Sequence, residues 1–307
     1  MKCAEDRDDF SVSMKLETYP NRDSLVFQER FGMHDCETFI RGTIRFTGFS
    51  AIISAFHDIG LTSDDPCDPS VKTLRDLLVS RIQGAHQHNS TIGPRSMQII
   101  DQVTNAMSKQ DQSLMRAALG RVDFSFLKDS RQLENAIKNI LKTMIFLGFL
   151  DPNCTVSAKD KDGKSRPCLD VLGDVMGKKL ALNDFDRDLV VMRHVFHLMD
   201  PSDGKRWAHT STMVASGKCK ADRGDTIMST TVGVTAALGA RLVLDKKIAS
   251  RGVLSPMTKD IYDPILKELD KQGIGMLEES ENPLAHAKML GNPITWPKCE
   301  KRRKQST

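Results

Sequence analysis

Two arginines on one expected strand are the side chains best suited to bind an anionic ligand. Arg41 and Arg45 stand four positions apart with Thr43 between them. On a strand they lie on one face, about 13 Å apart at ~3.3 Å per residue. A guanidinium is a planar fork that matches a carboxylate, and a strand holds such forks in place. A ligand with several carboxylates would suit this spacing; the alternative is a solvated strand face.

A turn upstream of this strand carries another arginine. Residues 19–24 read YPNRDS, and Pro, Asn and Asp in such a run favour a turn. Arg22 stands directly beside Asp23. A neighbouring pair of this kind is commonly a local surface ion pair, and a ligand clamp is the other interpretation.

The histidines and cysteines form no familiar catalytic or metal-binding motif. His194, His197 and His209 adjoin expected strands, but the spacing of Cys, His and carboxylates matches no standard metal site. The seven cysteines are irregularly spaced and include no C-x-x-C pair, which indicates neither a disulfide framework nor a zinc ribbon. We therefore assign no catalytic residue and expect no metal ligand.

Local fingerprints of nucleotide sites are missing as well. The one G-x-G begins at Gly273 and has Glu278 where a third glycine belongs. Walker A, H-E-x-x-H and G-x-S-x-G motifs do not occur. This sequence alone predicts no cofactor-binding residues.

Hydrophobic periodicity distributes these residues over strands and helices. Residues 38–46 alternate as a half-buried strand. Residues 189–192 read as a buried strand, with 210–214 as its candidate partner. A helix is expected at 130–147, where apolar residues recur at helical spacing and Gly148 ends the pattern. Other expected helices are 69–82 with Asp68 as N-cap, 169–182, 225–244 and 261–273.

Composition and charge restrict the class of protein. The 307 residues are 39% hydrophobic, as in ordinary globular proteins. A net charge of +4 is too small for a whole-molecule nucleic-acid-binding surface. The longest strongly apolar stretch, near 144–150, is too short to span a membrane. We expect a soluble α/β or α+β protein of a reducing compartment that binds neither nucleic acid nor membrane.

Seven segments between residues 16 and 274 carry a family resemblance. They read LETYPNRDSLVFQERFG, ETFIRGTIRFTGFSAIISAFHDIGL, TMIFLGFLD, DRDLVVMRHVF, HTSTMV, TVGVTAALGARLVLDKKI and RGVLSPMTKDIYDPILKELDKQGI. In this order they resemble the glutamate-forming saccharopine dehydrogenase family, including the dehydrogenase half of the bifunctional lysine-ketoglutarate reductase/saccharopine dehydrogenase. Residues 83–140 match only loosely.

The resemblance implies an arrangement of domains. Residues 16–224 would form an α/β (α+β) substrate-binding domain with a mixed sheet flanked by helices. Helices within 225–275 would pack on a Rossmann domain that this sequence lacks. Residues 1–15 are expected to be an N-terminal extension, and 276–307 a basic, disordered tail.

The resemblance also implies a function. The family oxidises saccharopine, which carries three carboxylates, with NAD or NADP to glutamate and 2-aminoadipate semialdehyde in lysine metabolism. Its substrate contacts correspond here to Arg22, Thr43, Ile44 and Arg45, and Arg41 is expected to be structural. Because the cofactor would bind only in the full-length enzyme, we expect this chain alone to be inactive.

The implied partners are saccharopine or a glutamate-like substrate, the Rossmann domain and a second copy in a homodimer. The implied location is the cytoplasm, or the mitochondrion for a bifunctional enzyme. Thr230 replaces the family's usual basic residue, and Val234-Thr235 replaces its Leu-Pro, which puts docking to the Rossmann domain in doubt. A catalytically silent binding module and a truncated gene model stay open as alternatives.

Overall fold

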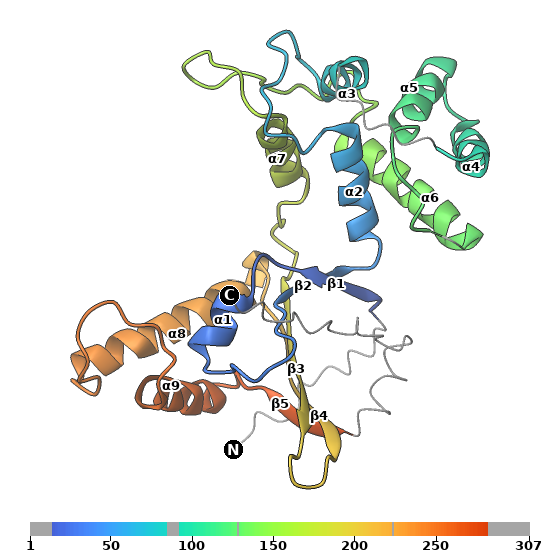
Figure 1. Ribbon diagram of the computed structural model, residues 1–307. Helices are drawn as coiled ribbons and strands as arrows, with labels where there is room; N and C mark the ends of the chain where they lie inside the picture. Colours follow the sequence, from blue (N-terminus) through green and yellow to red (C-terminus); the bar gives the residue numbers. More distant parts are fainter. Residues whose placement is uncertain (1–13, 85–91, 128, 223, 282–307) are drawn as a thin grey trace, which may run out of the picture. The chain divides into compact units, whose positions relative to one another are not determined.

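The computed structural model describes residues 14–84, 92–127, 129–222 and 224–281 (Figure 1). The chain divides into two compact units, Met1–Ala181 and Leu182–Thr307. Helices dominate the first unit, and an antiparallel sheet with two long helices makes up the second. This combination confirms the expected fold class. Most of the expected extension at 1–15 and of the expected tail at 276–307 lies outside the described residues.

The first unit begins with a two-stranded hairpin and continues as helices. Strands β1 and β2 pair antiparallel, from Leu16 opposite Phe46 to Pro20 opposite Gly42. Its described elements are β1 (Leu16–Pro20), α1 (Leu25–Arg30), β2 (Gly42–Phe46), α2 (Phe49–Ile59), α3 (Leu74–Gln83), α4 (Pro94–Thr104), α5 (Lys109–Leu119), α6 (Ser130–Leu147) and α7 (Cys168–Lys179).

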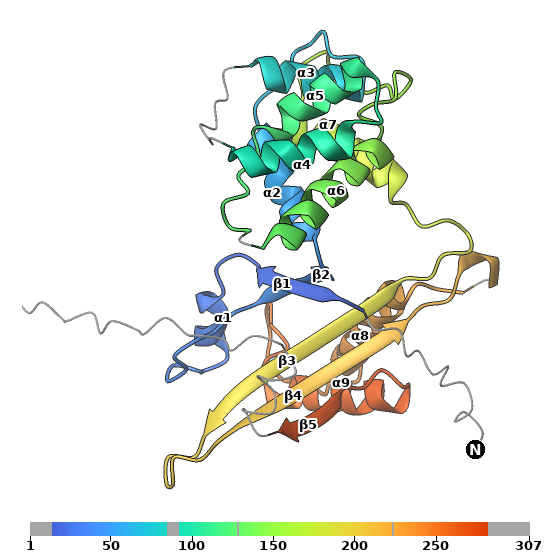
Figure 2. The ribbon, with the colours of Figure 1, turned by 90° about the vertical axis from the view of Figure 1, so that its right-hand side faces the viewer.

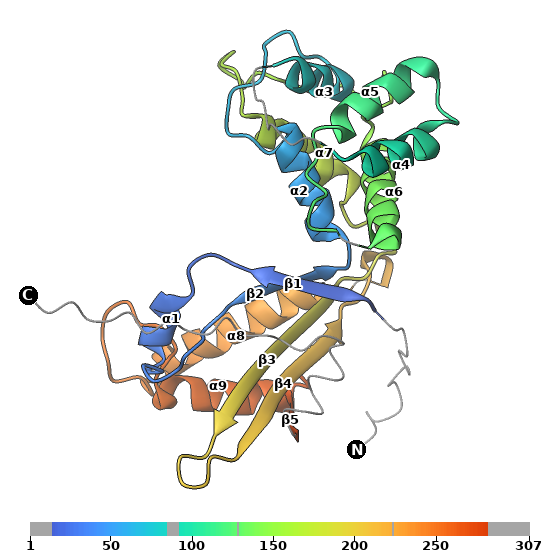
Figure 3. The ribbon, with the colours of Figure 1, turned by 45° about the vertical axis from the view of Figure 1, so that its right-hand side comes forward.

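Helices α2 to α7 of this unit enclose one hydrophobic core (Figure 3). Helix α2 packs on α6, and α4 packs on both α5 and α6. Phe56, Leu77, Ile100 and Ile140, from four different helices, are completely or almost completely buried. Burial of such a side chain is worth about 1.5–3 kcal/mol relative to exposure. This core is therefore the main source of the unit's stability.

Helix α6 confirms the helix expected at 130–147. The Asp129 carboxylate accepts hydrogen bonds from the backbone N–H groups of Arg131 and Gln132, at 2.8 and 2.9 Å, and so caps the first turn. Gly148 ends the helix with φ of 103°, which favours glycine. The apolar stripe faces the core, with Leu133, Ala136, Ile137, Ile140, Leu141, Met144 and Leu147 buried.

Helix α3 corrects the start expected at Asp68. The helix begins at Leu74, because Thr73 and Asp76 form a capping box in which each side chain accepts from the other's backbone N–H. Asp68 instead accepts from the backbone N–H and hydroxyl of Ser70, at 2.8 and 2.7 Å. Asp68 therefore stabilises a turn before the helix.

The strand expected at 38–46 forms only at its end, as β2. Its partner β1 ends at Pro20, which lacks a backbone N–H and leads into a turn. The strand ladder therefore ends at Gly42, and beyond it one backbone hydrogen bond, from Asn21 to Arg41, joins the two segments.

The second unit contains β3 (Leu189–Met199), β4 (Arg206–Ser216), the short 3-10 helix Lys220–Asp222, α8 (Ile227–Leu244), α9 (Lys259–Lys271) and β5 (Leu277–Glu281). The strands form one sheet in the order β3-β4-β5. Helices α8 and α9 lie together on one side of this sheet (Figure 2). Between them Leu242, Ile261, Ile265 and Leu269 form a small core.

Strand pairing in the second unit differs from the sequence-based expectation. The sheet is antiparallel instead of mixed. The short turn between β3 and β4 makes that pair antiparallel, and β5, which follows α8 and α9, also pairs antiparallel with β4. The strand expected at 189–192 is not buried: Leu189 is 41% and Met192 45% exposed. An apolar run indicates a strand, but burial also requires another layer over it. Residues 277–281 form a strand although periodicity is lost after Gly275.

Helix α8 has the length and composition of a membrane span, with a mean hydropathy of 1.5 and 6% of its residues buried. A helix that packs against further protein has the same properties, and α8 also carries Arg241 near its end. The expectation that the protein binds no membrane stays a prediction.

Candidate functional site

The hairpin places Thr43 and Arg45 on one face of β2. Their direct neighbours across the strand pair are Tyr19 and Glu17. Ile44 pairs with Thr18, and its side chain belongs to the opposite face because successive side chains alternate. The three residues expected to bind substrate on this strand are thus contiguous, with two side chains on one face.

Arg45 is exposed and lies against an aromatic pair. Its Cζ atom is 5.4 Å from the ring centroid of Phe49, and Phe49 stacks on Tyr19 at a centroid distance of 6.1 Å. Nη1 of Arg45 donates to the carbonyl oxygen of Ile44 at 2.9 Å. Cation–π contact orients the guanidinium and leaves further N–H groups for a ligand.

The carboxylate of Glu17, which lies opposite Arg45 across the strand pair, binds backbone N–H groups and not the arginine. Its carboxylate accepts from the backbone N–H of Gly48 at 2.8 Å and of Ser50 at 2.6 Å, at the start of α2. Burial raises the pKa of Glu17, but these hydrogen bonds outweigh it and hold the pKa below its usual value. Glu17 therefore fixes the hairpin to α2.

The turn with Arg22 is tied to the start of β2. Asn21 N–H donates to the Arg41 carbonyl oxygen at 2.8 Å, and Arg41 N–H donates to the buried Ser24 hydroxyl at 2.9 Å. Arg22 itself has φ of 57°, in the left-handed region that few non-glycine residues adopt. This conformation is typical of tight turns and of binding loops.

Arg41 has a different environment from Arg22 and Arg45. Its Cζ atom lies 4.0 Å from the ring centroid of Phe27, and its backbone joins both hydrogen bonds of the turn. These contacts agree with the structural role expected for Arg41. Within the described chain, no ion pair joins Arg22, Arg41 or Arg45 to a carboxylate.

The hairpin can therefore bind anions, while the described residues present no metal centre. No group of three or more His, Cys, Asp or Glu side chains is placed to hold a metal ion in the described part of the chain. Arg22 and Arg45 are exposed and have no carboxylate partner among the described residues, so each guanidinium can donate hydrogen bonds to a ligand carboxylate.

A polar cluster on β4 and β5 escaped the sequence analysis. His209 contacts Ser280 through Nδ1 at 2.9 Å and Glu278 through Nε2 at 2.8 Å. Ser211 donates to the same carboxylate at 2.7 Å, and this bond and His209 lower the pKa of Glu278. The residues are cross-strand neighbours, so the cluster joins β5 to the sheet. The cluster can be recognised only once β5 is known to pair with β4.

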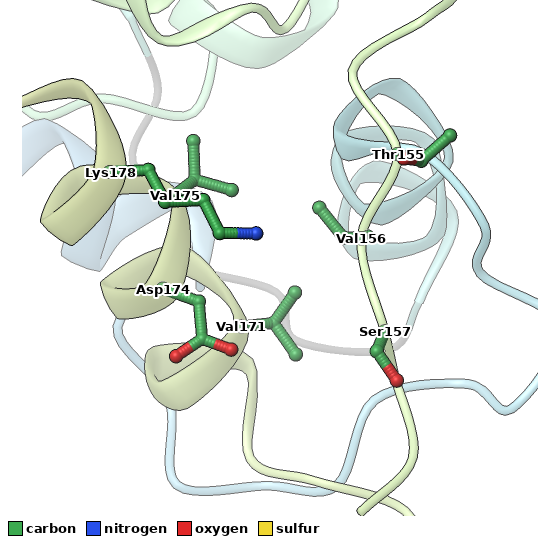
Figure 4. Close-up of a pocket in the computed structure, with 7 residues that line it drawn as sticks. All are labelled: Thr155, Val156, Ser157, Val171, Asp174, Val175 and Lys178. Carbon is green, nitrogen blue, oxygen red and sulfur yellow. The ribbon is translucent and has the colours of Figure 1, made fainter.

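Two hollows in the described part of the chain are lined by residues other than Arg22, Arg41 and Arg45. One, of about 320 Å³, lies between residues 155–157 and α7 (Figure 4). Lys178 points into it, whereas Asp174 is held by Arg166 at 2.8 Å. A second, of about 410 Å³, lies beside α1 and His34.

Comparison with known proteins identifies the family. The sequence model described as Saccharopine dehydrogenase C-terminal domain matches residues 1–274. The chain belongs to this family.

The named proteins that this chain resembles are saccharopine dehydrogenases and alpha-aminoadipic semialdehyde synthases. Saccharopine dehydrogenase [NADP(+), L-glutamate-forming] of Saccharomyces cerevisiae is 30% identical over 266 residues, 85% of this chain and 50% of that protein. Alpha-aminoadipic semialdehyde synthase of Arabidopsis thaliana is 28% identical over 269 residues, 87% of this chain and 23% of that protein. The apo structure of the L-Glu-forming Saccharomyces cerevisiae enzyme has a TM-score of 0.63 at 28% identity, covering 86% of this chain and 51% of that one.

The chain thus spans about half the length of the fungal saccharopine dehydrogenase. Within the part they share, the hairpin brings Thr43, Ile44 and Arg45 together on one strand, and the backbone links the turn of Arg22 to that strand through Arg41. The assignment of these four residues to substrate stays a prediction.

Proposed function

We propose that this chain is the saccharopine-binding part of an NAD(P)-dependent, glutamate-forming saccharopine dehydrogenase of lysine metabolism. Membership of the saccharopine dehydrogenase C-terminal domain family carries the proposal, and two arginines free of carboxylate partners on the hairpin support it. The relatives' names support NADP as cofactor of the whole enzyme, and NAD is the alternative.

Arg22 and Arg45 each bind one carboxylate of saccharopine in this proposal. The Thr43 hydroxyl and the backbone at Ile44 complete the contacts. Saccharopine has three carboxylates, so two charge-assisted, bidentate contacts fix its position as well as its orientation. The arginine side chains hold the substrate so that its reacting C–H bond faces the cofactor in the whole enzyme. Oxidation itself is the chemistry of the nicotinamide.

The described residues do not form the parallel βαβ unit in which a Rossmann domain binds a dinucleotide. A pyrophosphate binds at a helix N-terminus within a parallel βαβ unit, and the described strands pair only antiparallel. At the start of α8, the Asp188 carboxylate already accepts from the N–H groups of Ile227 and Met228, at 2.8 and 2.9 Å. The cofactor would bind to another part of the whole enzyme, a Rossmann domain, and the active assembly would be a homodimer. Its location would be cytoplasmic, or mitochondrial as part of a bifunctional enzyme.

A chimera provides the test, because the chain is half the length of the yeast relative. In this chimera the chain replaces the matching half of the yeast enzyme, and saccharopine-dependent reduction of NADP+ is measured. A charge-assisted contact contributes about 1.5–3 kcal/mol. Arg22→Ala and Arg45→Ala should therefore each weaken saccharopine affinity roughly 10- to 150-fold, and Arg45→Lys should restore part of it.

Arg41→Ala is the matched control, and its affinity should stay within about twofold of the parent. Circular dichroism verifies that each variant is folded. If both Arg22→Ala and Arg45→Ala keep the parent affinity while folded, the site assignment is wrong. A chimera that binds saccharopine by calorimetry without reducing NADP+ would favour the silent binding module.

A further inference from the structure

Two cysteines far apart in sequence meet inside the first unit. Cys67 and Cys168 are 101 positions apart, and the Sγ atom of Cys67 donates to that of Cys168 at 3.1 Å. Both side chains are buried, at 3% and 0% exposure. The Sγ atoms of Cys36 and Cys154 donate instead to the backbone carbonyl oxygens of Thr38 and Leu147. The sulfur atoms are about 1 Å from the separation of a disulfide bond.

The backbone around the two sulfurs is held on both sides. Pro66 and Pro167 form an antiparallel bridge. Cys67 N–H donates to the Arg166 carbonyl oxygen at 2.7 Å, and Cys168 N–H donates to the Asp65 carbonyl oxygen at 3.1 Å. Each cysteine directly follows a proline, whose ring fixes φ. The backbone therefore sets the sulfur–sulfur contact.

A buried cation stands next to the pair. The Arg81 side chain is 8% exposed, and its Nη2 atom lies 3.8 Å from Asp65. Its Nε and Nη2 atoms are buried without a hydrogen-bond partner in the described structure. The Cys67 hydrogen bond and then the Arg81 charge lower the pKa of Cys168, against the effect of burial. The hydrogen bond from Cys67 and the charge of Arg81 therefore favour the thiolate at Cys168.

We propose that Cys67 and Cys168 are a redox-active dithiol that a hydroperoxide converts to a disulfide and a dithiol reductant restores. The Cys168 thiolate attacks one peroxide oxygen, the O–O bond breaks, and a sulfenic acid and water form after proton uptake. The Cys67 sulfur then attacks the sulfenyl sulfur, and a second water leaves with the thiol proton. Two thiols lose two electrons and two protons, and hydrogen peroxide becomes two waters.

A metal ion does not compete for this pair, since the described residues bring no third metal-ligating side chain to it. The bond would close a loop that contains α3, α4, α5 and α6, the greater part of the core. Cross-links over loops this long stabilise proteins chiefly by restricting the unfolded chain. Oxidation should therefore raise the Tm by about 5–10 °C. This inference does not depend on the proposed function.

Peptide mapping of the full chain tests the proposal. The reduced protein is treated with hydrogen peroxide, alkylated, and digested without reductant. We expect a peptide that joins Cys67 to Cys168, that disappears on dithiothreitol treatment, and that accompanies the rise in Tm. Exposed Cys36 should be alkylated or oxidised without this link. Both cysteines recovered alkylated, or either joined to another cysteine, would overturn the proposal.

Variants test the contributions of the two cysteines and of Arg81 against control residues nearby. In Cys168→Ser the rise in Tm should be lost, whereas Cys154→Ser should retain it; if Cys168→Ser does not fold, the map of the parent protein decides alone. Arg81→Gln should slow disulfide formation about tenfold, the effect of one unit in thiol pKa, and Arg75→Gln on the same helix should not. An unchanged rate in Arg81→Gln contradicts the part assigned to Arg81.

Discussion

Helices α6 and α8 are both 18 residues long, yet their surroundings are opposite. Helix α6 in the first unit buries seven side chains, while α8 in the second buries only Leu242. Val232, Val243 and Leu244 of α8 are 61%, 62% and 80% exposed. The apolar residues of α6 form one stripe, and those of α8 surround the helix.

This difference shows that periodicity and hydrophobicity carry different information. A stripe predicts which face a helix buries, and α6 buries that face against its own unit. A helix that is apolar all round is typical of a site enclosed by protein or lipid. The described second unit covers only a small part of α8, so much of its apolar surface is available for association.

The largest expected contrast is in stability. Ile140→Ala in α6 removes a fully buried side chain and should lower the free energy of unfolding by about 2–5 kcal/mol, from lost burial and a cavity. Val243→Ala in α8 removes an exposed one and should change it by less than about 0.5 kcal/mol. Urea unfolding followed by circular dichroism measures both. Equal losses would mean that the two helices are buried alike.

A second contrast concerns self-association. The exposed apolar residues of α8 should make the purified chain associate at high concentration. Val232→Ser with Val243→Ser should reduce this association, measured by sedimentation at several concentrations, with little change in secondary structure. Thr235→Ser on the same helix is the control and should behave as the parent. A parent chain that stays monomeric throughout would show that the α8 surface is already covered.

The smallest contrast is in pH dependence, between Glu17 of the first unit and Glu278 of the second, two of the carboxylates that accept hydrogen bonds. The pKa of Glu17 and that of Glu278 are lower than their usual values in the folded protein. Each therefore contributes stability above about pH 4.3, the ordinary value for Glu, and that contribution is lost as the pH falls through the lowered pKa. Stability falls with acid because the unfolded chain binds the proton more tightly.

Glu17→Gln and Glu278→Gln should reduce the difference in urea midpoint between pH 7 and pH 3. The effect should be greater for Glu17, whose carboxylate accepts two backbone N–H groups at a helix start. The Glu278 side chain is 52% exposed, where solvent screens such interactions. Glu268→Gln, which removes a surface pair within α9, is the control. A larger effect at Glu278 would reverse the comparison.

Elements with a regular pattern were predictable from sequence, and others were not. The helices at α6, α8 and α9 were expected nearly as they are. The pairing of β3 with β4 was expected as well, but only for 189–192 and 210–214, short parts of two strands of 11 residues each. Helices α2, α4 and α5 were not predicted, because each has only 11 residues and its apolar pattern repeats over only three turns. Strand β5 was missed since its sequence, LEESE, is mostly acidic and pairing with β4 stabilises it.

The candidate site was also predictable only in part. Alternation alone put Arg41, Thr43 and Arg45 on one side of an expected strand, and the turn before it placed Arg22 nearby in sequence. Neither pattern distinguishes an arginine held on Phe27 from one beside Phe49, because those rings come from other elements.

The sequence by itself determined where helices α6, α8 and α9 lie, which side chains alternate on β2, and which family the chain resembles. These properties depend on spacing along the chain and on local backbone preference. Only the tertiary structure decided which apolar faces are covered, where β5 pairs, and that Cys67 meets Cys168 beside Arg81. Such contacts join residues that are far apart in the chain. They depend on how the whole core packs, and the spacing of residues along the chain does not determine that packing.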